Sequence, residues 1–436
     1  MDQIQSQFDP DRANTYTSVL SVTMVLDNSQ HILLESDHIV DLYFIEDIFS
    51  FIITGKIRFY DLYNLQEKGP LVGTETITVI YGGLQQRKIV FKLYDIKYHQ
   101  TADTNPTEGA LVEASFVDTS FETMLDTHYS RSFPKGQTYT TMVKFMLMNF
   151  CQWPESNIQM EESSNESPEA FAIPYWTIAM AAKFLLKRAI GKTSRTSGYL
   201  IYNSTQNNHS VNVKTLNYLF SQFNSFDADT YHFESSGDNI RLGQFKKNKI
   251  LEWEIEGRSR SGSSALYGGR WRGIDTSKGT MITDTYKFSE GIAETMLLGK
   301  KSLCYNESDT SRMIKTSAER NLVELHSVCY DEWSRAYNSQ NKASLLILGN
   351  ERRYCGHLIN LEWPSYDLKT EIYQKQLQGL WLVRGITHMF KPAEPIPYIQ
   401  KMVLLKNAYT YSESTQLISS TKKNVTGGVK TKFLDL

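Results

Sequence analysis

The chain has 436 residues, and 46 lysines and arginines against 48 acidic residues give a formal net charge of -2. This length exceeds what one hydrophobic core usually fills, so we expect two to four domains. The near-neutral charge excludes a chain-wide electrostatic attraction to nucleic acid or to an acidic membrane surface. The aromatic content, with 25 Tyr, 21 Phe and 7 Trp, favours an ordered protein rich in β-strands.

Four widely spaced cysteines, Cys151, Cys304, Cys329 and Cys355, form no CxxC pair. They are too few for a disulfide framework in a chain of this size, so we expect reduced thiols. The N-terminus lacks a basic stretch followed by an apolar one, and no run of about 18 apolar residues occurs. We therefore expect neither export by a signal peptide nor membrane insertion by this chain.

Apolar and polar residues alternate in the first part of the chain, at 20–24, 56–59, 76–79, 89–93 and 112–116. A period of two buries one face of each strand and leaves the other in solvent, as in an antiparallel sheet or barrel. This pattern predicts that residues 1–125 form a first barrel-like β domain.

The period then changes to that of a helix. Apolar residues at helical spacing predict helices in 136–150 and 177–189, the second capped by Thr177, and a shorter helix in 213–222. Strand-like segments lie between and after them. We therefore predict a mixed α/β domain over residues 126–245.

Strand-like segments return after residue 250 and are clearest between 344 and 407. They predict a second barrel-like β domain over 246–410, with an inserted loop and helical region near 312–339. Residues 411–436 read as a flexible, polar tail whose apolar end would become ordered against a partner. The predicted fold class is mainly β with an α/β insertion.

One segment concentrates arginines, namely Arg258, Arg260, Arg270 and Arg272, among glycines, serines and two aromatic residues. Arginine beside aromatic rings is a common way to contact nucleic-acid backbones without reading sequence. A solvated loop is the competing interpretation, and four arginines are too few to argue for DNA binding by a chain of net negative charge.

Two short Cys/His pairs, His326 with Cys329 and Cys355 with His357, together make the ligand set of a tetrahedral zinc site. The first two residues are separated from the other two by a long gap, and no tight turn pre-organises them. Buried thiols and incidental histidines are the favoured interpretation.

Catalytic motifs are absent from the sequence: we find no Walker loop, no dinucleotide fingerprint and no G-x-S-x-G elbow. Acid pairs such as Asp61 with Glu75, or Glu252 with Glu254, become a catalytic pair only if geometry brings them to one site. We therefore assign no catalytic residue, cofactor or metal, and expect no enzymatic activity.

An apolar crossing, Pro70, Leu71, Val72 and Gly73, lies where a hairpin loop would normally be polar. Burial between strands or against an adjacent subunit would explain it, with Pro70 restricting the unfolded chain and Gly73 permitting the turn. Glu75 then fits a structural hydrogen-bonding role.

Six segments, taken in order, together resemble one family. They are GKIRFYDLYNLQEKGPLVGTETITV (55–79), the stretch from ASFVDTS to KFML (114–147), IPYWTIAMAAKFLLKRAI with SGYLIYNST and VKTLNYLF (173–220), SGSSALYGGRWRGIDTSKGTMITDTYKF (261–288), GHLINLEWPSYD (356–367), and GLWLVRGITHMF with YIQKMVLLKN (379–407). The chain thereby resembles the baseplate hub proteins of contractile-tailed bacteriophages, which are related to the hub portion of type VI secretion spike proteins.

The resemblance implies a homotrimer in which each chain contributes two similar barrel-like β domains, so that three chains imitate a six-fold ring. Implied partners are a central spike protein, tail tube or tube-initiator proteins and baseplate wedge proteins, with DNA passing transiently. The implied location is the tail baseplate of a virion assembled in the bacterial host cytoplasm. In such a ring the arginine-rich segment would line the channel or contact a neighbouring baseplate protein.

Two alternatives stay open on the sequence alone. One is the hub of a phage-derived contractile injection or secretion device. The other is a β-rich carbohydrate-binding or glycan-cleaving protein, in which Trp153, Trp253, Trp271 and Trp381 would stack on sugar rings.

Overall fold

The computed structural model describes fifteen stretches of the chain between residues 19 and 409. They are 19–26, 29–65, 71–83, 86–99, 109–222, 230–232, 250–257, 269–275, 278–286, 294–298, 301–302, 314–316, 322–338, 341–362 and 378–409. The predicted tail at 411–436, and the residues Pro70, Arg258 and Arg260, lie outside them.

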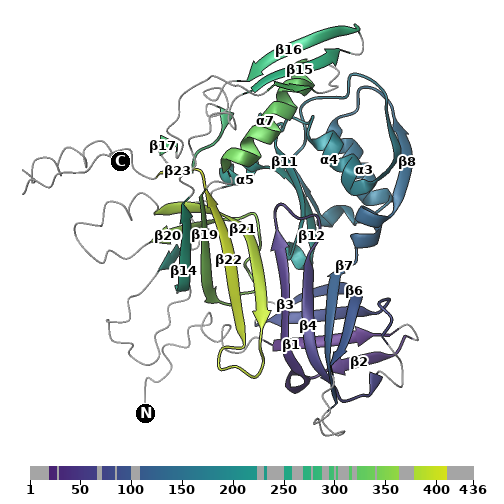
Figure 1. The fold of residues 1–436 in the computed structure, drawn as a ribbon, viewed down its shortest axis with the longest axis vertical. Helices are drawn as coiled ribbons and strands as arrows, with labels where there is room; N and C mark the ends of the chain where they lie inside the picture. Colours follow the sequence, from purple (N-terminus) through teal and green to yellow (C-terminus); the bar gives the residue numbers. More distant parts are fainter. Residues whose placement is uncertain are drawn as a thin grey trace, which may run out of the picture.

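A 13-stranded sheet dominates the structure (Figure 1). Its strands are β1 (Val19–Val25), β2 (His31–Leu34), β3 (Ile39–Asp47), β4 (Thr54–Asp61), β5 (Thr76–Gly82), β6 (Arg87–His99), β7 (Ala110–Asp118), β13 (Thr230–His232), β14 (Ile250–Gly257), β19 (Asn341–Leu348), β20 (Leu358–Glu362), β21 (Gly379–Phe390) and β22 (Tyr398–Lys406). The main path runs β14-β19-β22-β21-β3-β4-β7-β6-β5-β1-β2, and β20 joins β21 and β13 beside it. Among the described pairings of this sheet, only that of β13 with β20 is parallel.

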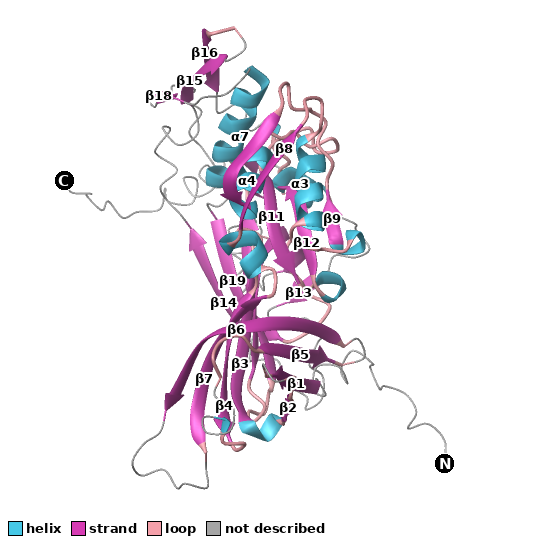
Figure 2. Ribbon diagram, turned by 90° about the vertical axis from the view of Figure 1, so that its right-hand side faces the viewer, coloured by secondary structure: helices cyan, strands magenta, loops and turns pink. Residues whose placement is uncertain are grey.

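The middle of the chain folds above this sheet into a helical unit with two small sheets (Figure 2). Its elements are β8 (His128–Phe133), α3 (Tyr139–Asn149), β9 (Ile158–Met160), β10 (Phe171–Thr177), α4 (Ile178–Leu186), β11 (Tyr199–Ser204), β12 (Ser210–Thr215) and α5 (Leu216–Ser221). Each of the three helices begins at a threonine, Thr138, Thr177 or Thr215, whose side chain accepts a hydrogen bond from the backbone N–H three residues later. All three predicted helices are confirmed. They could be predicted because the caps and the helical spacing of apolar residues are local signals in the sequence.

The last helix, α7 (Leu322–Asn338), confirms the helical region predicted near 312–339. A small sheet of β15 (Gly269–Asp275), β16 (Thr280–Tyr286) and β18 (Ile314–Thr316) packs beside it, and β17 (Lys301–Ser302) pairs with β23 (Ala408–Tyr409). No helix among the described residues is long and apolar enough to cross a membrane.

The large sheet has two parts, a first β block of β1 to β7 and a second β block of β13, β14 and β19 to β22. One hydrophobic core lies in each block. The first draws almost all its side chains from β1 to β7, and the second from β13, β14 and β19 to β22. Phe390 and Tyr398 of the second block pack in the first core, since β3 pairs directly with β21. The predicted class, mainly β with an α/β insertion, is confirmed, and the two β blocks share one continuous sheet.

Candidate functional site: the seam between the two β blocks

A polar seam interrupts the apolar side of the sheet where β3 meets β21. Phe44 lies opposite His388, and Glu46 lies opposite Ile386. In both strands the alternating pattern puts these positions among core residues, yet a carboxyl and an imidazole occupy them. Both Glu46 and His388 are completely buried. Buried polar groups must find hydrogen-bond partners within the protein.

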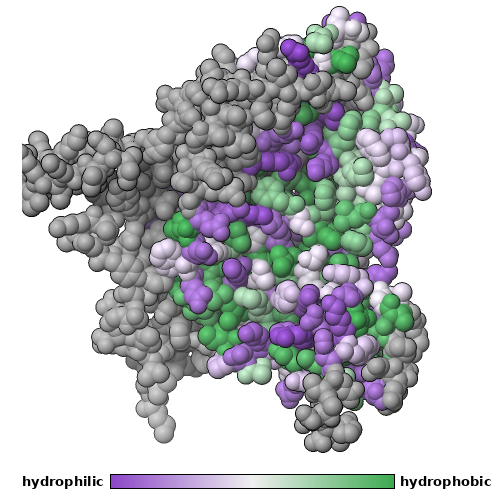
Figure 3. Space-filling model, viewed as in Figure 1, coloured by the Kyte–Doolittle hydropathy of each residue, from purple (hydrophilic) through white to green (hydrophobic). Residues whose placement is uncertain are grey.

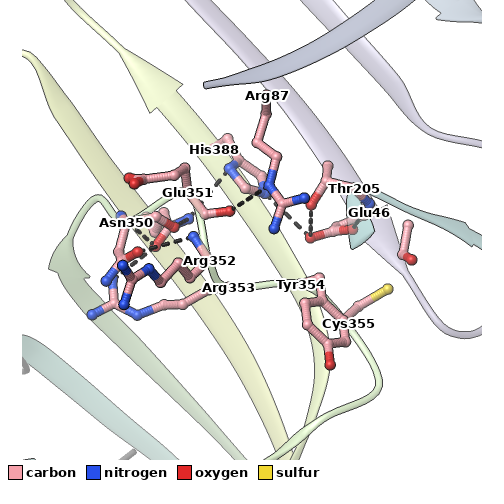
Figure 4. Close-up of polar contacts among 12 residues, drawn as sticks. Glu46, Arg87, Thr205, Asn350, Glu351, Arg352, Arg353, Tyr354, Cys355 and His388 are labelled. Atoms are coloured by element: carbon pink, nitrogen blue, oxygen red, sulfur yellow. Dashed lines mark hydrogen bonds and ion pairs between the residues drawn. The ribbon is translucent and has the colours of Figure 1, made fainter. Parts of the chain in front are cut away.

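Glu46 finds these partners in two other parts of the chain (Figure 4). Its Oε1 lies 3.2 Å from His388 Nε2. The backbone N–H of Thr205, in the turn after β11, donates to Oε2 at 2.8 Å, and the Thr205 hydroxyl donates to Oε1 at 3.3 Å. One carboxyl therefore joins the first β block, the second β block and the middle unit.

His388 is held on its other side by the second β block. Its Nδ1 lies 2.8 Å from the Tyr398 hydroxyl, which also accepts from Gln400 Nε2 at 2.8 Å. The ring stacks on Phe44, with centroids 4.4 Å apart. Because both nitrogens have partners and the ring has no exposed surface, His388 positions strands and cannot act on a soluble substrate.

The loop between β19 and β20 completes the seam. Arg353, almost fully buried, donates from Nη1 to Gln400 Oε1 at 2.9 Å and from Nε to the Tyr231 hydroxyl at 2.7 Å. Arg87 of β6 donates to the Glu351 carbonyl at 3.2 Å. Burial raises the pKa of the Cys355 thiol well above its usual value, and Glu46 nearby adds to the rise, so this thiol stays protonated.

A second buried contact ties the first β block to the middle unit. Asp118, at the end of β7, pairs with the His209 ring and accepts from Asn203 Nδ2 at 3.1 Å. Burial alone would raise the pKa of Asp118, but the contacts with His209 and Ser120 outweigh it and lower that pKa. The His209 ring also packs against Trp153 at 4.7 Å. This contact too is structural, since Asp118 is fully buried.

The apolar crossing divides between core and surface. Leu71 is 7% exposed and belongs to the first core, whereas Val72 is 65% exposed. Gly73 has φ +92, a value that favours glycine. The buried Glu75 accepts the backbone N–H groups of Val72 and Gly73 at 2.7 and 2.8 Å, which holds the crossing in place.

The arginine-rich segment is only partly described. Arg270 and Arg272 lie on β15, opposite Thr285 and Thr283 of β16. The interpretation of this segment as a loop is therefore wrong for residues 269–272, because strand pairing begins at Gly269. Arg272 is partly exposed.

The Cys/His pairs do not meet. Cys329 packs in the core around α7, and Cys355 packs in a different core with α5 and β22. Cys355 and His357 lie in the turn before β20. Within the described ranges no group of three or more His, Cys, Asp or Glu side chains could hold a metal ion.

The other candidate residues are spread over the fold. Glu252 and Glu254 are exposed at alternate positions of β14, at one end of the sheet path. Trp153 and Trp381 are buried in cores, which removes two of the four tryptophans proposed to stack on sugars.

Comparison with known proteins gives matches in structure and none in sequence. No protein-family model matches the chain, and no curated protein matches it. A tail protein from Neisseria meningitidis MC58 superposes with a TM-score of 0.58 at 11% identity, over 90% of this chain and 97% of that one. The 43 kDa tail protein of prophage MuSo2 from Shewanella oneidensis gives 0.55 at 13% identity, over 89% and 98%. The chain has the fold of these tail proteins.

This tail-protein fold spans both β blocks and the unit between them, because the matches cover nearly the whole of each chain. The resemblance to hub-type tail proteins noted on the sequence is thereby confirmed at the level of the fold.

The side of the tail-protein sheet that faces away from the first core carries a row of alternating charges. Asp41, Arg58, Glu113 and Lys97 lie opposite one another on β3, β4, β7 and β6. Arg58 Nε donates to Asp41 at 2.9 Å, and Lys56 Nζ lies 3.1 Å from Glu113. On the face seen in Figure 3, hydrophilic and hydrophobic residues are interspersed over the described part of the chain. Such a row offers polar contacts with little net charge.

Proposed function

We propose that this chain is the structural baseplate hub of a contractile phage tail. In this proposal three copies form a ring that adapts a three-fold central spike to the six-fold tail tube and lets DNA pass during injection. The shared tail-protein fold supports the proposal, as does the ordered series of hub-like segments in the sequence. The chain itself makes and breaks no bond in this role.

The observation that carries the proposal is the direct pairing of β3 with β21, which joins the two β blocks together with the buried seam beside it. An adaptor of this kind needs six equivalent β blocks from three chains, held at fixed angles. A hinge between the blocks would let those angles vary, and the match to a hexameric tube would be lost. A continuous sheet and a buried carboxyl shared by three units remove such a hinge.

The predicted domains take roles in this ring. Residues 1–125 and 246–410 supply the two barrel-like blocks, 126–245 form the α/β unit between them, and the tail at 411–436 docks on a partner. The partners are the central spike, tail tube or tube-initiator proteins and baseplate wedge proteins. The protein acts in the virion tail after assembly in the host cytoplasm, and the arginine-rich segment faces the channel or a baseplate neighbour.

The same geometry serves the hub of a phage-derived injection or secretion device, which differs in what the ring delivers. Electron microscopy of particles from cells that carry the tagged chain tests both. We expect label at the tip of a tube, in rings of three-fold symmetry around a channel, and the presence or absence of a DNA-filled head separates the two devices. Label distributed along the tube, or absent from tube tips, would contradict the proposal.

A further inference from the structure

A short strap, Glu294–Leu298, passes between α5, α7 and the end of β22, and side chains hold its main chain. On one side, Asn217 of α5 donates from Nδ2 to the Glu294 carbonyl at 2.7 Å. The same side chain accepts the Met296 N–H at its Oδ1, at 3.2 Å. One asparagine thus contacts two main-chain groups that are two residues apart.

Asn407, directly after β22, repeats this arrangement two residues further along the strap. It donates from Nδ2 to the Met296 carbonyl at 3.0 Å and accepts the Leu298 N–H at 2.9 Å. Lys406 Nζ lies 3.4 Å from the Leu298 carbonyl. A residue of a parallel strand bonds the C=O and N–H on either side of its neighbour in the same way. The side chains of the two asparagines therefore take the place of a parallel strand beside the strap.

Asn217, Asn407 and Lys406, which we call the clamp, bind main-chain groups of the strap. The clamp therefore places few demands on the amino-acid sequence of the strap. Glu294 is exposed and Met296 is 46% exposed. Two strap side chains are buried: the Thr295 hydroxyl lies 2.9 Å from the Tyr330 hydroxyl, and Leu298 packs in the core beside α5. Leu297 is partly buried against the core around α7, and Glu294 Oε1 lies 3.8 Å from His326 Nε2. The same segment of a second copy carries these side chains and meets these demands.

The clamp residues also have partners apart from the strap. Asn217 donates to the Tyr330 hydroxyl at 3.2 Å, and Asn407 donates to Asn338 Oδ1 at 2.8 Å. Lys406 Nζ lies 3.0 and 3.1 Å from the carbonyls of Gln378 and Leu380. These contacts orient the clamp whether or not the strap is in place, and such pre-organisation favours binding.

We propose that Asn217, Asn407 and Lys406 form a peptide-binding groove whose built-in occupant is Glu294–Leu298, and that the same segment of a second copy binds there when the built-in one is displaced. Exchange between identical chains keeps every hydrogen bond and costs little. The exchange between copies rests on the proposed ring, whereas the groove itself does not.

The test frees the groove in the full chain and supplies the segment in trans. Met296→Pro removes the N–H that Asn217 accepts, while Met296→Ala keeps it and serves as the matched control. The probe is a fluorescein-labelled Glu-Thr-Met-Leu-Leu amide, followed by anisotropy. We expect it to bind Met296→Pro at least ~10-fold more tightly than the control, a gain on the scale of one buried hydrogen bond. Adding Asn217→Ala and Asn407→Ala should abolish the gain.

Equal affinity for the proline and alanine variants, or a gain that survives loss of both asparagines, would overturn the proposal. If the proline variant does not fold, the wild-type chain decides the question by hydrogen exchange in excess peptide. We expect the Met296 and Leu298 amides to exchange faster with the peptide and not with its analogue N-methylated at methionine; no effect of either would overturn the proposal. A peptide that binds a chain which never assembles would count against the ring and leave the groove standing.

Discussion

Replacing His388 by leucine removes the ring that joins Glu46 to Tyr398 across the seam. Its hydrogen bonds with Glu46, Tyr398 and Gln400, at 3.2, 2.8 and 3.3 Å, disappear, and so does the stack on Phe44. Glu46 keeps its contacts with Thr205, and Tyr398 keeps Gln400, but each loses a buried partner. A buried polar group left short of a partner costs about 1–3 kcal/mol, so the substitution, which affects Glu46 and Tyr398, should cost about 2–6 kcal/mol.

This loss is a large share of the roughly 5–15 kcal/mol that usually stabilises a domain. Urea unfolding followed by tryptophan fluorescence measures it as a lower midpoint. His31→Leu is the control, since His31 is exposed on β2, and it should change stability by less than about 0.5 kcal/mol.

A double-mutant cycle sharpens the argument. With Glu46→Leu in the same chain, no carboxyl is left without its partner, so the double variant should be more stable than the sum of the two single losses by about 1–3 kcal/mol. Additive losses, or a His388→Leu variant as stable as the control, would refute the assignment of the seam as a joint.

Three further changes probe other contacts. His209→Ala removes the imidazole partner of the buried Asp118, which keeps Asn203 and Ser120, and should cost about 3–5 kcal/mol, read as a lower melting temperature. Because the pKa of Asp118 is lowered in the folded chain, the His209 contribution should fade as acid protonates Asp118, and a pH-independent loss would argue against it. Burial lowers the pKa of Lys406 to about 7 from 10.5. Between these pH values the unfolded chain binds more protons than the folded one, so the stability of the wild-type chain relative to Lys406→Met should rise with pH. A stability difference that stays constant with pH would contradict this. Val72→Asp should leave the melting temperature unchanged but weaken subunit association in light scattering, because Val72 is exposed. Leu71→Asp should instead unfold the first core. If both substitutions destabilised the fold equally, Val72 would belong to the core and not to a contact between subunits.

Much of the fold is predictable because its signals are local. A threonine followed by apolar residues at helical spacing fixes the start of α4 at Thr177, and strict alternation identifies β4 and β5. Burial within the crossing is also partly predictable, but adjacent residues of an extended chain point to opposite sides. Leu71 enters the core for that reason, and Val72 does not.

The seam and the strap escape such reasoning. Glu46 and His388 are 342 residues apart, so no spacing in the sequence connects them. One signal was present: each is a polar residue at the core position of an alternating strand, between Phe44 and Ile48 and between Ile386 and Phe390. The strap leaves no comparable signal, because Asn217 and Asn407 bind main-chain atoms that every residue has.

The mass of the assembled chain tests the proposed ring most directly. Native mass spectrometry or light scattering of the purified protein, alone and mixed with the spike and tube proteins proposed as its partners, reports how many copies associate. One chain has a mass of 50.1 kDa, and the hub account predicts three copies, about 150 kDa. A chain that stays at 50.1 kDa under all these conditions would contradict it.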